Sequence, residues 1–189
     1  GVLLQWGTHV GLSTVSAPDR LRYPPVPASG QGRSDFLGDG TGFFCGGTKG
    51  EVTVRESSSG ALRESYLDGN PSPVPGPPIA ASADGRFIAS RNSPVVDRQA
   101  SGRAKFPVHA GMFHAAAFSP DGARLATGGY DNRLELWALP EGRFLGVVGR
   151  HHTAVTAVEF SPDGRFVASV EDGLVRVWNI RRPTWVREI

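Results

Sequence analysis

Residues 118–137 read FSPDGARLATGGYDNRLELW, and residues 160–178 read FSPDGRFVASVEDGLVRVW. The two blocks begin with phenylalanines that lie 42 positions apart and end with tryptophans that lie 41 positions apart. A histidine stands nine positions before each of these phenylalanines. A period of ~40 residues indicates an architecture in which one small unit is stacked several times.

Weaker copies of the same block lie upstream. Residues 81–90 read ASADGRFIAS, and residues 36–55 read FLGDGTGFFCGGTKGEVTVR. The run VLLQW at 2–6 resembles the second half of a unit whose first half is missing. The spacing therefore predicts one domain over 1–189, made of a half unit at 1–15 and units at about 34–68, 78–108, 109–148 and 150–189.

Each unit is expected to be a four-stranded antiparallel meander. An Asp-Gly pair separates two apolar runs in every copy, and this dipeptide suits the positive backbone angles of a tight hairpin. A later strand alternates, because Leu134 and Leu136 fall on one face while Glu135 and Trp137 fall on the other. The fold class is thus all-β. One such sheet has apolar residues on both faces, so neighbouring units must stack to bury them.

Composition limits the possible functions. The chain has 189 residues with 25 Gly and 15 Pro, and this density of breakers argues against long helices. Cys45 is the only cysteine, which excludes a disulfide framework and a multi-cysteine metal site. The net charge of +2 is too small to predict nucleic acid as a partner. Without an apolar run of ~18 residues, no membrane partner is expected either.

At this point the repeat resembles the WD-repeat β-propeller family. That resemblance implies a hydrogen-bonded network of His, Ser/Thr, Asp and Trp in each blade. Carried over to these copies, it selects His109, Thr127, Asp131 and Trp137 in the third full unit, and His151, Ser169, Asp172 and Trp178 in the last. Propellers of this family commonly close with more blades than this chain supplies. An incomplete ring is therefore expected, completed by residues upstream of Gly1 or by another chain.

The chain departs from the family pattern at several points. Val108 and Arg150 stand before the two histidines, where the family usually has glycine. The last unit is one residue shorter, with 12 positions from Phe160 to Asp172 against 13 from Phe118 to Asp131 in the unit before it. We therefore expect the network of the last unit to be misplaced or incomplete.

Catalytic and metal-binding interpretations are weaker than structural ones. His109 with Asp131 could form a catalytic dyad, but the structural network accounts for both residues. His151 and His152 could suggest a metal site, but adjacent strand residues point to opposite faces. The prediction is therefore no catalytic residues, no metal and no cofactor. A propeller hydrolase stays open as an alternative that would need convergent ionisable groups in the central funnel.

The resemblance implies a non-catalytic scaffold that binds a protein or peptide on one face of the propeller. The positions expected to reach that face are Lys49, Tyr130, Asn132, Arg150, His152 and Glu171. A second alternative is nucleic-acid binding by an arginine and tryptophan platform near the C-terminus, formed by Arg176, Arg181, Arg182, Arg187, Trp178 and Trp185. The regular FSPDG blocks resemble those of bacterial multidomain proteins, and a cytoplasmic location is expected.

Overall fold

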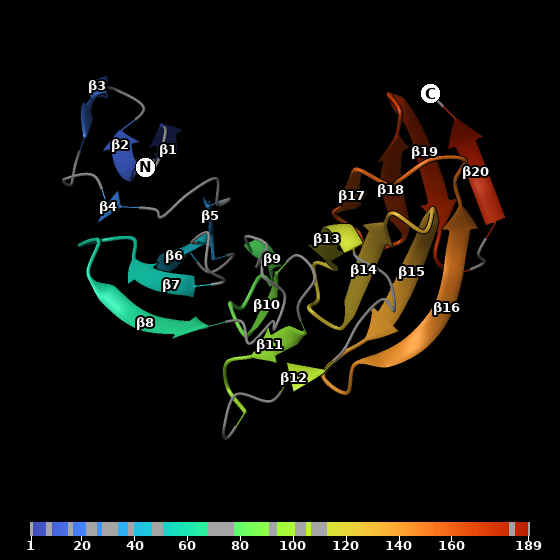
Figure 1. The fold of residues 1–189 in the computed structure, drawn as a ribbon, viewed down its shortest axis with the longest axis horizontal. Helices are drawn as coiled ribbons and strands as arrows, with labels where there is room; N and C mark the ends of the chain where they lie inside the picture. The colour runs from blue at the N-terminus through green and yellow to red at the C-terminus, as the bar shows by residue number, and fades with distance from the viewer. Residues whose placement is uncertain are drawn as a thin grey trace.

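The computed structural model describes most of the chain. The described residues are 2–6, 9–14, 17–21, 26–27, 34–37, 40–46, 51–67, 78–90, 94–100, 105–106, 113–181 and 184–188. Every regular element among them is a β-strand, which confirms the all-β prediction. Figure 1 shows the strands grouped into separate sheets that follow one another along an open arc, with the two ends of the chain at opposite ends of that arc.

The strands form five sheets of four strands each. The first three sheets contain β1 (Val2–Trp6), β2 (His9–Thr14), β3 (Ala17–Leu21) and β4 (Val26–Pro27); β5 (Ser34–Phe36), β6 (Gly42–Gly46), β7 (Glu51–Glu56) and β8 (Leu62–Leu67); and β9 (Pro78–Ala81), β10 (Phe87–Ser90), β11 (Val95–Asp97) and β12 (Lys105–Phe106). In the first sheet β2 pairs with β1, β3 and β4, so this sheet extends well beyond the half unit expected at 1–15.

The last two sheets are antiparallel meanders in sequence order. They contain β13 (Phe113–Phe118), β14 (Arg124–Gly129), β15 (Arg133–Ala138) and β16 (Arg143–Arg150), and then β17 (Ala157–Phe160), β18 (Phe166–Glu171), β19 (Leu174–Asn179) and β20 (Thr184–Glu188). Their registers correspond, because Leu125 pairs with Trp137 in the fourth sheet as Val167 pairs with Trp178 in the fifth. The two sheets can therefore be compared position by position.

A repeated serine and aspartate arrangement makes the first hairpin of the last three sheets. Ser119 donates its hydroxyl to Asp121 at 2.5 Å and accepts the amide of Arg124 at 2.9 Å. Gly122 follows the aspartate with φ +68°, a left-handed conformation that glycine adopts without strain. The hydrogen bond from Ser119 holds the pKa of Asp121 below its ordinary value. The same contacts recur around Ser82 and Ser161, so the Asp-Gly pairs in these sheets form and stabilise hairpin turns.

The core lies between the sheets. One apolar cluster joins the fourth and fifth sheets, and it includes Leu134 and Leu136 from one side and Val158 and Val167 from the other. Glycine permits the close approach at this junction, because a Cβ on Gly128 would lie 2.4 Å from Cγ1 of Val155. Burial of about 25 cal/mol per Å² of apolar surface makes this stacking the main source of cohesion between units.

Candidate functional site

The polar network predicted for the fourth sheet is present in part. The indole nitrogen of Trp137 donates to Oγ1 of Thr127 at 3.0 Å. Asp131 lies in the exposed turn between β14 and β15, where it accepts the amide of Arg133 at 3.2 Å and lies 3.6 Å from its guanidinium. His109 lies outside the described residues. The tryptophan and hydroxyl of the predicted network thus come together across neighbouring strands.

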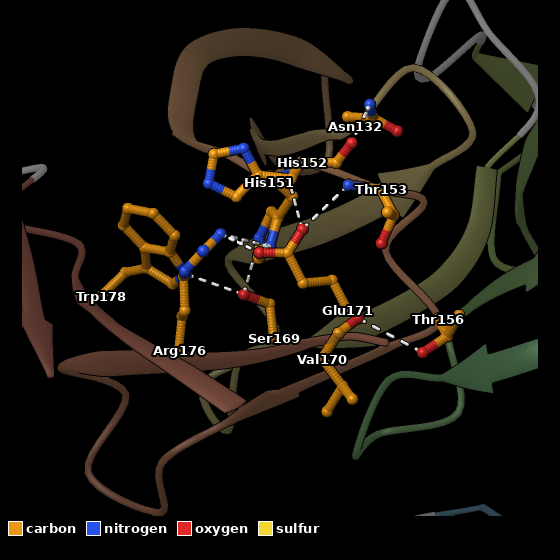
Figure 2. A network of polar contacts seen from close by, with 10 residues as sticks. All are labelled: Asn132, His151, His152, Thr153, Thr156, Ser169, Val170, Glu171, Arg176 and Trp178. Atoms are coloured by element: carbon orange, nitrogen blue, oxygen red, sulfur yellow. Dashed lines mark hydrogen bonds and ion pairs between the residues drawn. The ribbon is translucent and has the colours of Figure 1, made fainter. Parts of the chain in front are cut away.

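The fifth sheet has a more deeply buried network (Figure 2). Trp178 donates to Oγ of Ser169 at 2.7 Å, and the same oxygen lies 3.0 Å from Nε2 of His151. The other ring nitrogen, Nδ1, lies 3.4 Å from Glu171 and 3.3 Å from Arg176. Glu171 and Arg176 also form a direct ion pair. We call these five residues the His151 network.

Glu171, rather than the predicted Asp172, is the carboxylate that faces His151. The turn between β18 and β19 is a tight one in which Glu171 pairs with Leu174, and Asp172 and Gly173 both have positive φ. Asp172 is therefore exposed at the tip of the turn. Because strand side chains alternate, Glu171 shares the inward face with Ser169, two positions before it.

Glu171 also holds the loop that connects the fourth sheet to the fifth. Its Oε2 accepts the backbone amides of His152 at 2.5 Å and Thr153 at 2.9 Å. The side chain is only 2% exposed. Glu171 is thus unavailable to a partner in this conformation, which corrects its placement among the exposed binding residues. Its role in the fold is to fix the backbone on which the neighbouring exposed residues stand.

The electrostatics of the network follow from burial. Burial lowers the pKa of His151, against the opposing effect of Glu171, so the imidazole is neutral near pH 7. Burial alone would raise the pKa of Glu171, but the amides of Thr153 and His152, together with His151 and Arg176, lower it overall. Nδ1 of His151 faces both the guanidinium of Arg176, which can only donate, and the carboxylate of Glu171, which can only accept. Arg176 supplies the positive charge beside Glu171.

Sequence reasoning missed Arg176 as a member of this network. It was considered as part of a nucleic-acid platform together with Trp178, but the two residues are only 7% and 6% exposed. The alternation of side chains along the strand could have identified it, because Arg176 lies two positions before Trp178 and therefore faces the same side of the sheet, where it pairs with Ser169. The side chains of Trp185, Arg182 and Arg187, which were part of the same interpretation, lie outside the described residues.

The other residues predicted to bind a partner lie near the loop that Glu171 holds. Tyr130 is 57% exposed, and its ring makes an edge contact with His114 at 4.9 Å between centroids. Asn132 donates its side-chain amide to the carbonyl oxygen of His152 at 3.1 Å. Arg150 and His152 are exposed, and Figure 2 shows the His152 ring directed away from the network. Lys49 lies outside the described residues.

A separate polar cavity of about 250 Å³ lies between the second and third sheets. Arg98 donates to Glu64 and to the carbonyl of Gly85 at this junction. Arg63, which also lines the cavity, contacts Thr41 at 3.1 Å and Glu56 at 3.6 Å. Because both guanidinium groups already contact protein acceptors, the cavity is a weaker candidate for a site than the exposed residues around Tyr130. The described residues contain no group of three or more His, Cys, Asp or Glu side chains that could hold a metal.

Four-stranded antiparallel sheets that stack through apolar faces along an arc define a β-propeller architecture. Residues 102–138 and 142–179 match the family model described as "WD domain, G-beta repeat", or WD40. These two segments, which cover the fourth sheet and most of the fifth, are thus similar to repeats of the WD40 family.

Relatives and solved structures agree with this assignment. The chain is 33% identical over 84 residues to Protein HIR1 of Kluyveromyces lactis, covering 35% of this chain and 10% of that protein. It is 36% identical over 74 residues to Transducin beta-like protein 3 of Bos taurus, covering 38% and 9%. Eukaryotic translation initiation factor 3 subunit I of Phaeosphaeria nodorum is 33% identical over 97 residues, covering 50% and 29%. The chain thus spans less than a third of each of these relatives.

The fold also resembles that of solved propellers. The crystal structure of the RRP9 WD40 repeats aligns with a TM-score of 0.67 at 18% identity, covering 81% of this chain and 49% of that one. The structure of U3-55K aligns with a TM-score of 0.66 at 18% identity, covering 81% and 50%. At this identity the likeness concerns the fold alone.

The expectation of a bacterial-type protein is not supported. The relatives named above come from a yeast, from cattle and from a filamentous fungus. The FSPDG block forms a Ser-Asp-Gly hairpin in each of the last two sheets, so local geometry accounts for it without reference to lineage.

The described part of the chain has no helix with the length and hydrophobicity of a membrane span.

Proposed function

We propose that this chain is a non-catalytic scaffold that binds a protein or peptide at the end of the sheets where Tyr130, Asn132, Arg150 and His152 lie. The observation that carries the proposal is the way Glu171 fixes the backbone of His152 and Thr153 from inside the protein. The backbone of the loop is therefore held in place before a partner binds. Binding costs less when the interface residues are held in place in advance.

The chemistry of the exposed residues fits a partner-binding role. Tyrosine and arginine are frequent among residues that dominate binding energy, and Tyr130 and Arg150 are both exposed at this end. The relatives agree in kind, since one of them is named as a subunit of a translation initiation factor. Lys49 stays in the proposed set on the strength of the sequence alone.

The buried network is poorly suited to catalysis or to nucleic-acid stacking. His151 and Glu171 have side chains that are 0% and 2% exposed, so a substrate would have no access to them. Trp178 and Arg176 are held inside the sheet by hydrogen bonds to Ser169 and Glu171. These contacts favour the scaffold over both alternatives. A cytoplasmic location is part of the proposal, in keeping with a sequence that has a single cysteine, which is buried.

A library of random peptides displayed on phage would test the binding face. Peptides enriched on the wild-type chain are expected to lose roughly tenfold or more in affinity for the Tyr130→Ala/Arg150→Ala variant. The matched control is Phe144→Ala/Arg143→Ala, which removes an exposed aromatic and an exposed arginine from the outer strand β16. Equal loss in both variants, or no enrichment above a carrier protein, would count against the proposal, provided that circular dichroism shows folded variants.

We also propose that a further sheet completes the open arc. The first and fifth sheets lie at its two ends (Figure 1), and the chain covers about half of each of the two solved propellers named above. Exposed sheet faces and edges favour association, which a closed ring avoids.

A further inference from the structure

Two arginines lie directly opposite each other at the end of the fourth sheet that carries the proposed binding residues. Arg133 on β15 pairs with Arg150 on β16. The amide of His151 donates to the carbonyl oxygen of Asn132 at 2.8 Å, so the two arginines form the non-hydrogen-bonded kind of antiparallel pair. In such a pair the Cα atoms lie about 4.5 Å apart, and both side chains leave the same side of the sheet.

The two arginines differ in their acidic neighbours. The guanidinium of Arg133 lies 3.6 Å from Asp131 and 4.0 Å from Glu135. Arg150 is exposed, and within the described part of the chain no carboxylate lies at ion-pair distance from it. Like charges directly opposite each other on neighbouring strands are unfavourable. Arg150 is therefore the cation of this pair that an external anion would satisfy.

The stacked-sheet architecture does not require arginine at these positions. In the second sheet the register places Glu51 where the fourth sheet has Arg133, and Glu51 pairs with Leu67. In the fifth sheet Leu174 stands at the same position. Neither residue is basic. The paired arginines are thus a property of the fourth sheet rather than of the repeat.

The backbone next to Arg150 is held on both sides of the β16 end. His151 is bonded to the turn through the carbonyl of Asn132, whose side chain donates to the carbonyl of His152 at 3.1 Å (Figure 2). Glu171 accepts the amide of His152 at 2.5 Å from inside the fifth sheet. A side chain on a fixed backbone loses less freedom when it binds. The guanidinium also presents its donors as a fork that matches the two oxygens of a carboxylate.

We propose that Arg150, supported by Arg133, binds the carboxylate of an aspartate or glutamate side chain in the partner peptide. The single charge of a carboxylate matches the one arginine that lacks an acidic neighbour. A phosphate monoester carries nearly two negative charges, and Asp131 beside Arg133 would repel the second of them. The inference rests on the proposed function and adds the chemistry of the partner.

Peptide selection on a charge-reversed variant tests this inference. A random peptide library displayed on phage is selected in parallel on the wild-type chain, on Arg150→Glu and on Arg143→Glu. We expect the wild type to enrich peptides with an acidic residue at one consensus position, and Arg150→Glu to enrich lysine or arginine there. Arg143 is exposed on the same strand but outside the pair, so Arg143→Glu is the matched control. It should enrich the same acidic peptides as the wild type.

The most enriched peptide then gives the size of the effect. Changing its acid to the corresponding amide, or changing Arg150→Gln, should each lower the affinity roughly tenfold. Both changes together should cost little more than either alone, because they remove the same contact. Arg150→Gln should also unfold at the same or a higher urea concentration than the wild type, since it removes the like charge opposite Arg133. A residue with only a structural role would lose stability instead.

The possible failures are distinguishable. No enrichment on the wild type above a carrier protein would overturn the proposed function and this inference together. Enrichment of peptides that lack the acid, or the same acidic consensus on Arg150→Glu, would overturn the inference alone. Binding that becomes roughly tenfold or more tighter with phosphoserine in place of the acid would assign the site to phosphate. Competition by a short single-stranded RNA at the same concentration as the peptide would assign it to nucleic acid, and either result would overturn the carboxylate.

Discussion

The fourth and fifth sheets share the FSPDG hairpin and the same strand register, yet their ion pairs differ in how far they are exposed to solvent. In the fourth sheet the turn acid Asp131 is exposed and lies near Arg133, whose side chain is 43% exposed. In the fifth sheet the acid Glu171 is 2% exposed and pairs with Arg176, whose side chain is 9% exposed. Register places Glu171 where the fourth sheet has Gly129 and Arg176 where it has Glu135. The fifth sheet therefore has a buried ion pair at positions where the fourth sheet has none, and breaking a buried pair has a larger cost than breaking an exposed one.

The largest expected effect is from Arg176→Met. Removing the cation leaves Glu171 as a buried carboxylate that keeps its two amide donors but loses its ion-pair partner. We expect a loss of about 3–5 kcal/mol in the free energy of unfolding, measured by urea denaturation. Arg133→Met in the fourth sheet is the matched control and is expected to cost less than about 1 kcal/mol.

A double variant sharpens that prediction. Glu171→Gln/Arg176→Met removes both charges and retains an acceptor oxygen toward the amides of His152 and Thr153. It is expected to recover most of the stability lost in Arg176→Met. Equal destabilisation by Arg133→Met and Arg176→Met would show that burial does not distinguish the two pairs.

A smaller effect is expected from Gly128→Ala at the junction of the two sheets. The new methyl group would lie 2.4 Å from Cγ1 of Val155, so the fifth sheet must shift. The expected loss in the free energy of unfolding is about 1–3 kcal/mol, again by urea denaturation. Because the new methyl group would lie 2.4 Å from Cγ1 and 2.7 Å from Cβ of Val155, Gly128→Ala/Val155→Gly should be more stable than the sum of the two single changes predicts. Additivity would contradict close packing at this point.

The smallest expected effect is a pH dependence that arises from His151. Its pKa in the folded protein is lowered by burial, so the unfolded chain binds more protons than the folded protein below the ordinary histidine pKa of about 6.5. Stability from this group is therefore complete above that pH and is lost as the pH falls toward the lowered value. Urea denaturation of wild-type and His151→Gln between pH 7.5 and 5.5 should show a steeper decline for the wild type. Identical slopes would mean that His151 titrates normally.

The positions of the hairpins and the stacking of the sheets were predictable from the chain. The three Asp-Gly pairs at Asp84, Asp121 and Asp163 lie in the expected turns, and the alternation of Leu134 and Leu136 places both residues in the cluster between sheets. Such local signals are reliable because turn conformation and side-chain direction depend on neighbouring residues. The acidic partner of His151 was harder to predict from the sequence, because the choice between Glu171 and Asp172 depends on the register across the β18–β19 turn.

By itself, the sequence determined a series of four-stranded units that must be buried against one another, since period, turn chemistry and apolar alternation are local properties. The tertiary structure alone decided which charges are inside. The burial of Arg176 with Glu171, and the contact of Glu171 with the backbone of His152 and Thr153, depend on strands and loops that are distant in sequence. Burying a charge is unfavourable unless an opposite charge and hydrogen-bonding groups lie beside it, and only the folded chain brings these groups together.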